Sequence, residues 1–138
     1  MLSKKTKYGL KALSFLAKQE QNVPVLISDI STSENISKKF LESILLTLKK
    51  SGILSSKKGK GGGYFLLKKP NEIKIATIIR LLEGPIAMLP CVSLNYYEKC
   101  DDCVSEEKCS LSILMAEVRD STLKILESKT LANFNCGE

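Results

Sequence analysis

Four of the five cysteines in this chain stand close enough together in the sequence to share a metal centre. They are Cys91, Cys100, Cys103 and Cys109, spaced C-x8-C-x2-C-x5-C. Thiolates at such a spacing can hold a tetrahedral zinc ion or an iron–sulphur cluster. The acidic residues among them indicate an exposed segment, which disfavours inert buried thiols and leaves metal-free thiol sensing open. Cys136 stands apart and is assigned no role.

The chain contains no histidine, and this absence excludes many catalytic and metal-binding arrangements. Nucleophilic triads of the Ser-His-Asp type, Cys-His pairs, histidine proton shuttles and histidine-liganded metals all require that residue. Because no convincing nucleophile–base pair remains, we expect a protein that is not an enzyme.

The sequence also predicts a cytoplasmic protein. No apolar run approaches the roughly 18 residues of a membrane span, and the N-terminus lacks the apolar core of a signal peptide. Thiols stay reduced in the cytoplasm, so the cysteines are better explained as metal ligands or redox sensors than as a disulfide framework. Their odd number points the same way.

Positive charge is concentrated in the first half of the chain. Residues 1–70 hold fourteen lysines and four acidic residues, a net charge of +10, whereas residues 71–138 carry a net charge of −4. This asymmetry predicts that the first half meets a polyanion. Nucleic acid is the first candidate and an anionic membrane surface the second, while an ordinary solvated lysine-rich surface is the alternative.

The apolar pattern of the first half predicts three helical segments. Helical spacing runs from Tyr8 to Leu16, and a short amphipathic piece covers residues 25–30. A third helix, capped by Ser37, ends at Gly52, where a helix C-terminal glycine belongs. Its expected apolar face comprises Phe40, Leu41, Ile44, Leu45 and Leu48.

A glycine-tipped hairpin follows, and the rest of the chain is helical again. Strands are expected at residues 53–57 and 64–67, joined by the turn 58–63. A helix over 75–82 is stopped by Gly84 and Pro85, and a second helix covers 110–128. The apolar stripe of that last helix must be buried on the core or on a second copy of the chain, and the last ten residues read as a frayed tail. The stripe comprises Leu111, Leu114, Met115, Val118, Thr122 and Ile125.

Three helices followed by a glycine-tipped hairpin predict a winged helix-turn-helix whose third helix reads DNA. Lysines at the start of that helix would approach phosphates, and Glu42 would accept a hydrogen bond from a base, unless it is an ordinary solvated glutamate. The hairpin tip would be the wing, where glycines permit close backbone approach to DNA; the loop does not match a nucleotide-binding pattern. The candidate DNA-binding residues are Lys38, Lys39, Glu42, Lys57, Lys58, Lys60, Gly61, Gly62, Gly63 and Tyr64.

The chain closely resembles the Rrf2 family of bacterial winged-helix regulators, over about residues 1–128. The resemblance implies homodimers that bind palindromic operators, with the long C-terminal helix as the dimer interface. It divides the chain into a DNA-binding domain (1–86), a cysteine-rich sensor loop (87–109), and a dimerisation helix with its tail (110–138). The segments that carry the resemblance are Leu2-Ser3, Tyr8–Leu13, Asp29–Ser31, Ile36-Ser37, Phe40–Glu42 with Leu45, Leu48–Gly52, Gly61–Tyr64 and Leu82–Pro85.

Many members of that family carry a 2Fe–2S or 4Fe–4S cluster on three cysteines in the loop before the long helix. By position these are Cys91, Cys103 and Cys109 here, and Glu42 matches the family glutamate that reads the operator. Other members lack a cluster and respond to a protein partner or another signal.

The family's known fourth ligands are missing from this chain. IscR-like members use a histidine where this chain has Ser112, and NsrR-like members use an aspartate where it has Lys7. Cys100 is the obvious substitute, and all-cysteine ligation leaves zinc open. The expected partners are therefore a double-stranded DNA operator and a second copy of the chain, with no membrane and with a protein partner as an alternative source of control.

Overall fold

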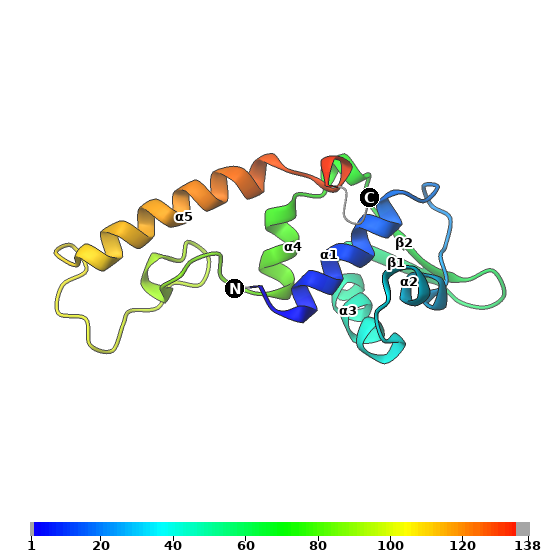
Figure 1. Cartoon of the computed structure of the whole chain (residues 1–138), viewed down its shortest axis with the longest axis horizontal. Helices are drawn as coiled ribbons and strands as arrows, with labels where there is room; N and C mark the ends of the chain where they lie inside the picture. The colour runs from blue at the N-terminus through cyan, green and yellow to red at the C-terminus, as the bar shows by residue number, and fades with distance from the viewer. Residues whose placement is uncertain (1, 135–138) are drawn as a thin grey trace.

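The computed structural model describes residues 2–134. Figure 1 shows a helical body at one end and a long helix, α5, that extends from it beside a loop-rich segment. Because most described elements are helices, the prediction of a mainly α fold with a small β-hairpin is confirmed. The α-helices are α1 (Lys4–Ala17), α2 (Ile27–Glu34), α3 (Lys38–Lys50), α4 (Ile75–Leu82) and α5 (Ser110–Ser128). The remaining elements are the strands β1 (Leu54–Lys57) and β2 (Gly63–Leu66), and the 3-10 turns η1 (Pro70–Glu72), η2 (Pro90–Val92) and η3 (Leu131–Asn133).

The helices of the body enclose one hydrophobic core. Ser37 caps α3, because its side chain accepts a 3.2 Å hydrogen bond from the amide of Phe40. The next turns of α3 bury one face completely, and each leucine or isoleucine buried in this way stabilises the fold by roughly 1.5–3 kcal/mol. This burial fixes which face of α3 is left outward. The buried face comprises Leu41, Ile44, Leu45 and Leu48, each 0% exposed.

Phe40 departs from the expected face of α3. It lies at the edge of the core, 36% exposed, rather than within it. Its ring meets that of Tyr8 on α1 edge-on, with centroids 5.7 Å apart and an interplanar angle of 83°. The first turn of α3 therefore extends past the buried core and is braced from the side by α1.

The hairpin is held to the body by the segment that precedes α2. β1 and β2 are antiparallel, with Leu54 paired to Leu66 and Lys57 to Gly63. The amides of Val25 and Tyr64 each donate a 2.8 Å hydrogen bond to the other residue's carbonyl. Gly63 has φ +143°, and a Cβ there would collide with the Val25 carbonyl oxygen. Glycine is thus required where the hairpin joins the body.

The end of the described chain returns to the body after α5. The Leu131 amide donates a 3.0 Å hydrogen bond to the Ile73 carbonyl, and the Ile75 amide donates one of 3.0 Å to the Lys129 carbonyl. Leu131 is 2% exposed and belongs to the core. The expectation of a frayed tail is therefore wrong for residues 129–134, since long-range hydrogen bonds and burial hold them. The division of the chain at residues 86 and 109 stays a prediction, and Cys136 lies outside the described residues.

The apolar stripe expected on α5 is left largely uncovered. Leu111, Leu114, Val118 and Ile125 are between 36% and 60% exposed. Only part of the expected stripe, Met115 and Thr122, belongs to the face that α5 turns toward the rest of the chain. That inner face comprises Ser112, Met115, Ala116, Arg119, Thr122, Leu123 and Leu126.

Candidate functional site

The outward face of α3 carries the charged residues expected to contact DNA. Lys38 and Lys39 are exposed in its first turn, and Glu42 is exposed one turn further along. The free amides and positive dipole of a helix N-terminus add to the lysine charges there. Two further outward residues, Ser43 and Leu46, were not predicted from the sequence; their spacing of one and four residues from Glu42 was the available signal.

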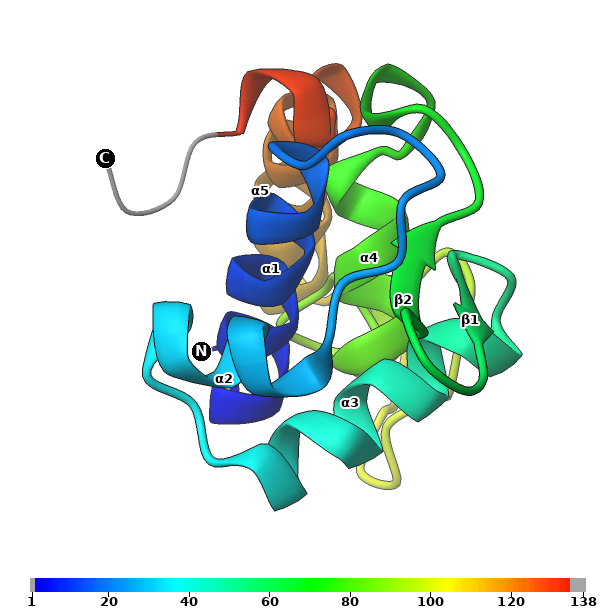
Figure 2. The same ribbon diagram turned by 90° about the vertical axis from the view of Figure 1, so that its right-hand side faces the viewer.

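The hairpin lies beside α3, as Figure 2 shows from that side of the molecule, and it carries a second set of lysines. Lys57, Lys58 and Lys60 are all exposed at its tip. The tip is closed by a 3.0 Å hydrogen bond from the Gly62 amide to the Gly59 carbonyl. The two basic segments therefore flank one surface, which a phosphate backbone could span.

Not every residue of the expected wing faces outward. Gly61 is exposed, whereas Gly62 is buried and Gly63 and Tyr64 are half-buried. The backbone of Tyr64 is bonded to Val25, and Gly63 lies against the same segment. The structure thus gives Gly62, Gly63 and Tyr64 a role in holding the hairpin, while the exposed lysines are free to meet a ligand.

The four clustered cysteines line one cavity of about 570 Å³ at the start of α5. Each of their side chains is neither fully buried nor fully exposed. Within residues 2–134 none is in a disulfide. The cavity thus brings together the four cysteines, which fall within a window of 19 residues in the sequence.

Two of these thiols are tied to the first turn of α5. Cys109 is the N-cap of the helix, and its Sγ accepts a 3.5 Å hydrogen bond from the Ser112 amide. The Cys91 thiol, on η2, donates to the Ser112 hydroxyl with Sγ and Oγ 4.0 Å apart. Ser112, at the position where IscR-like family members are expected to have a ligand, therefore joins the first and last cysteines of the window.

Two groups in the cysteine-containing segment, Cys100 and Tyr97, have raised pKa values. A side-chain hydrogen bond with Cys91 raises the pKa of the Cys100 thiol, and desolvation adds to the effect. The Tyr97 hydroxyl donates to the Glu106 carboxylate, and this bond raises the pKa of Tyr97 to about 12. Both shifts favour the protonated form of the group concerned.

The thiols share a cavity without converging on one point. Across residues 2–134, no three side chains of histidine, cysteine, aspartate or glutamate form a group that could hold a metal ion. The donor chemistry nevertheless fits a cluster or a zinc ion, because four soft sulphur ligands line one space. Ligation would require the loop between Cys91 and Cys109 to close around the metal.

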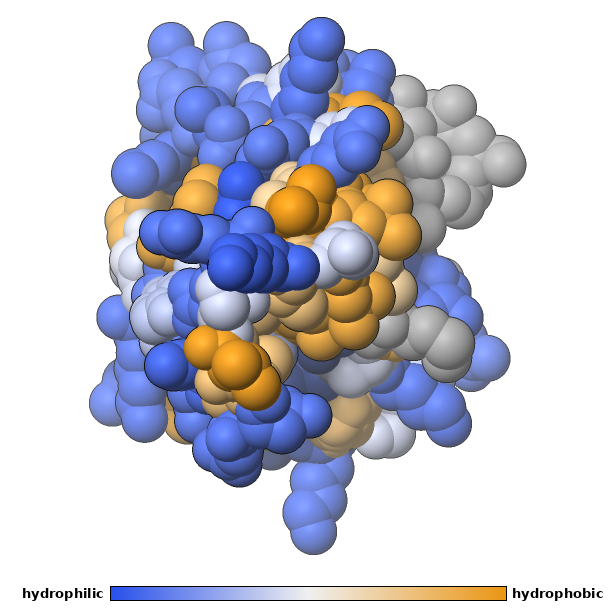
Figure 3. Space-filling view, turned by 90° about the vertical axis from the view of Figure 1, so that its left-hand side faces the viewer, coloured by the Kyte–Doolittle hydropathy of each residue, from blue (hydrophilic) through white to orange (hydrophobic). Residues whose placement is uncertain are grey.

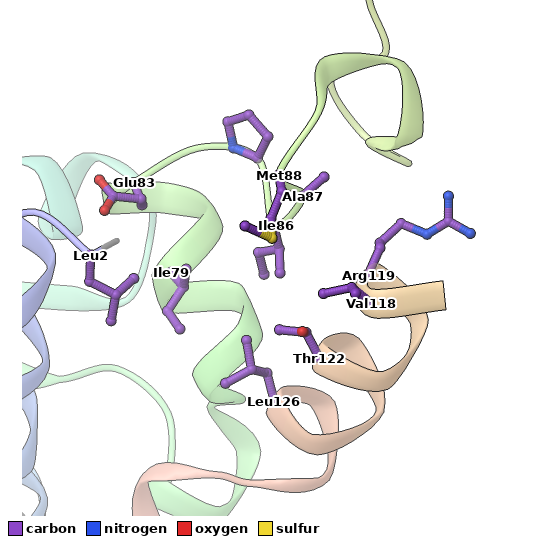
Figure 4. Close-up of a pocket in the computed structure, with 11 residues that line it drawn as sticks. Leu2, Ile79, Glu83, Ile86, Ala87, Met88, Val118, Arg119, Thr122 and Leu126 are labelled. Carbon is purple, nitrogen blue, oxygen red and sulfur yellow. The ribbon is translucent and has the colours of Figure 1, made fainter. Parts of the chain in front are cut away.

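An apolar groove of about 370 Å³ lies between α4 and the middle of α5. Figure 4 shows Ile79 of α4 and Val118, Thr122 and Leu126 of α5 around it, with Leu2 at one side. The exposed stripe of α5 continues from this groove through Val118. Figure 3 views the molecule from the end at which α5 begins, and it shows apolar surface gathered in the middle of that face.

No helix in the described part of the chain has both the length and the apolar character to cross a membrane.

Comparisons with known proteins all point to one family of transcriptional regulators. The family model described as "Rrf2: Iron-dependent Transcriptional regulator" matches residues 2–136. An rrf2-like HTH-type transcriptional regulator of Rhodobacter capsulatus is 42% identical over 134 residues, which cover 95% of this chain and 89% of the relative. The solved structure of CymR (YrzC), the global cysteine regulator of B. subtilis, matches with a TM-score of 0.78 and 32% identity, covering 96% of this chain and 94% of that one. That of T. potens IscR matches with a TM-score of 0.73 and 32% identity, covering 96% and 84%.

Proposed function

This chain belongs to the Rrf2 family of transcriptional regulators, and from that premise we propose that it is a homodimeric, sequence-specific DNA-binding protein controlled by an iron–sulphur cluster. Its fold is the winged helix of that family. Because its relatives are transcriptional regulators, the chain is not an enzyme. Its partner would be operator DNA in the cytoplasm.

DNA binding by α3 and the hairpin is supported by charge and exposure together. Lys38 and Lys39 would meet phosphates at the N-terminus of α3, while Lys58 and Lys60 would meet them from the wing. Glu42 would read a base, because an acidic side chain facing DNA is repelled by the phosphates unless it accepts a hydrogen bond. Lys57, Gly61, Gly62, Gly63 and Tyr64 would shape the wing around these contacts.

Dimerisation through α5 is supported by the apolar stripe that the chain leaves uncovered. Leu111, Leu114, Val118 and Ile125 recur at helical spacing and are at least 36% exposed. A continuous apolar stripe of this kind is unfavourable in water and favours burial against a partner. A second copy presenting the same stripe would bury it symmetrically, as closed dimers do.

The cluster proposal rests on one observation above the others: the cavity lined by Cys91, Cys100, Cys103 and Cys109 lies at the first turn of α5. Cys109 caps the same helix that would form the dimer interface. Cys91, Cys103 and Cys109 would be the ligands implied by the family, with Cys100 as the fourth. When bound, a cluster would supply a redox-sensitive centre whose charge changes with its state.

Control of DNA affinity would follow from this placement. A change at the thiol cavity would move the start of α5, and in a dimer α5 sets the separation of the two α3 helices. Half-sites that lie about one DNA turn apart tolerate little change in that separation. Gain, loss or oxidation of the cluster would therefore change operator affinity.

Anaerobic purification tests this function directly. We expect a coloured protein that contains iron and sulphide, with visible absorbance in proportion to its iron and sulphide content. Cys103→Ala and Cys109→Ala should each abolish the chromophore and alter operator affinity, whereas Cys136→Ala, outside the described residues, should do neither. Unchanged colour and DNA binding in the first two variants would contradict control by a cluster.

A cluster-free regulator is the second candidate, and one observation favours it: the described donors do not converge into a metal-holding group. In a metal-free regulator of this kind, redox-active thiols would act in the same loop and a protein partner would supply the signal. A structural zinc ion held by the same cysteines is the other cluster-free form. Colourless protein with one zinc per chain would identify structural zinc. A chain that binds no metal even after attempted cluster reconstitution would favour thiol chemistry or a protein partner.

A further inference from the structure

We propose that Arg119 is a positioning residue of the thiol site, which holds the Cys91-bearing turn η2 on α5. Its Nη1 donates a 2.7 Å hydrogen bond to the carbonyl of Val92, the residue that follows Cys91. The role of this contact in metal binding rests on the proposed function, whereas the hydrogen bond itself is present in the structure. It would place Cys91 where it can act together with Cys109.

Arg119 is an unusual residue for its position. The inner face of α5 is otherwise small, apolar or uncharged, and the Arg119 side chain is only 17% exposed there. An arginine that is largely withdrawn from water needs hydrogen-bond partners for its fixed donors. Val92 supplies one acceptor, and Asp120, whose own side chain is 66% exposed, supplies another at 2.7 Å.

The direction of the side chain matches this role. Long side chains on a helix lean toward its N-terminus, so Arg119 covers the part of α5 that leads back to Ser112. Figure 4 shows Val118 and Thr122 beside the groove while the guanidinium of Arg119 points away from it. Arg119 and Ser112 are seven residues apart and share one face, so η2 lies against α5 between the two.

The turn that Arg119 holds is itself well ordered by hydrogen bonds. The Val92 and Ser93 amides donate to the carbonyls of Leu89 and Pro90 over 3.2 Å each, and the Glu98 amide also donates to Pro90 over 3.2 Å. Val92 and Ser93 are 4% and 6% exposed. Anchoring this turn at one carbonyl therefore fixes the backbone on both sides of Cys91.

Cys91 and Cys109 thus form a prepared pair, which the structure already holds at α5. Cys100 and Cys103 would have to move toward that pair to bind the same metal. Both members of the first pair are linked to α5, Cys91 through η2 and Ser112, and Cys109 as the helix cap. Among the described residues, neither member of the second pair is bonded to α5: Cys100 has a side-chain hydrogen bond with Cys91, and the Cys103 amide donates to the Cys100 carbonyl over 3.1 Å. A metal would bind the prepared pair with less reorganisation than an open loop demands.

The test compares three variants of the full-length protein. Arg119→Met keeps an unbranched apolar side chain and removes the charge and the donors, whereas Arg119→Lys keeps the charge and N–H donors without the planar guanidinium. Asp120→Asn weakens the ion pair and leaves the bond to Val92 in place. Backbone hydrogen exchange is measured on each metal-free protein, and thermal midpoints are recorded alongside.

We expect Arg119→Met to speed exchange of the Val92, Ser93 and Glu98 amides by about tenfold, with the hairpin and α3 unchanged. After reconstitution with ferrous iron and sulphide, a chelator should strip iron from this variant about tenfold faster than from the parent. Arg119→Lys should restore much of both properties, and Asp120→Asn should match the parent.

Two results would overturn the role of Arg119. One is parental exchange at these three amides in Arg119→Met. The other is faster exchange throughout the protein with a lowered thermal midpoint, which would mark a general loss of stability. If the parent itself takes up no iron and sulphide, the cluster function fails, and the exchange data still decide whether Arg119 positions the turn.

Discussion

The Ser3 amide donates a 2.5 Å hydrogen bond to Oε1 of Glu83, joining the start of α1 to the end of α4. Glu83 also stands where the chain leaves the body toward the cysteines. Further along α1, Tyr8 contacts Phe40 at the start of α3. Helix α1 therefore touches both the exit to the thiol segment and the first turn of the expected DNA-reading helix.

Glu83→Ala should destabilise the protein by about 1 kcal/mol, because it removes a charge-assisted hydrogen bond that is open to solvent. Urea denaturation followed by circular dichroism measures the change, with the slope against urea expected to stay constant. Glu20→Ala removes an exposed carboxylate between α1 and α2 and serves as the matched control. Equal stability of the two variants would show that the Ser3 contact contributes nothing.

Replacing Lys58 and Lys60 together by alanine should weaken binding to all DNA sequences alike. The slope of log K against log salt should fall by about one unit for each phosphate that the wing no longer neutralises. The control is the double replacement of Lys68 and Lys69, which removes the same charge beyond the other end of β2. A parental salt slope in the first variant, or an equal decrease in the control, would remove the wing from the interface.

Glu42→Ala should relax sequence preference rather than reduce general affinity. Removal of a hydrogen bond to a base should lower discrimination at one base pair in each half-site by about 1–3 kcal/mol. Binding to a set of single-base operator variants measures this, with Glu34→Ala at the end of α2 as the control. If discrimination is kept at every position, Glu42 is an ordinary solvated residue.

Gly63→Ala should destabilise the fold by about 2–4 kcal/mol, since its Cβ would collide with the Val25 carbonyl in a backbone conformation that alanine avoids. Gly61→Ala is the control, because φ is +77° there but nothing lies within 4 Å of the new Cβ. That strain alone should cost about 1 kcal/mol. Thermal unfolding of both variants measures the difference, and similar midpoints would refute close contact at Gly63.

Leu114→Lys should convert a dimer into a monomer by placing a charge in the exposed stripe of α5. Ile113→Lys is a stringent control, because Ile113 is also exposed, at 60%, but lies on another side of the same helix. Sedimentation velocity gives the mass of each variant directly. A dimeric Leu114→Lys protein, or a monomeric parent, would place the interface elsewhere.

Local signals in the sequence account for most of the winged-helix half of the chain. Ser37 and Gly52 bracket α3 as expected, and the glycine-rich turn forms the predicted hairpin. These features depend on neighbouring residues, for which caps, periodicity and turn chemistry are reliable guides. Phe40 lies at the edge of the core rather than within it, because periodicity cannot show where a helix extends beyond the core that it covers.

Long-range arrangement is what the sequence could not supply. Nothing local to Leu131 indicates that it fills the core, because its hydrogen bond goes to Ile73, 58 residues earlier. The stripe on α5 was recognised, but periodicity does not distinguish a core from a partner subunit. Likewise, cysteine spacing identifies the thiols, whereas Arg119 becomes visible only when its contact with Val92 is known.

Lys74 and Thr130 form an isolated antiparallel bridge, which joins the residue before α4 to the segment after α5. The chain leaves the body after α4, passes the cysteines and α5, and completes the core only when Leu131 returns. During synthesis on a ribosome, the helices and hairpin proposed to contact DNA would therefore emerge before Leu131 can complete their core. The nascent chain cannot complete the core of its first half until residues 91–131, with the four clustered cysteines among them, have been made.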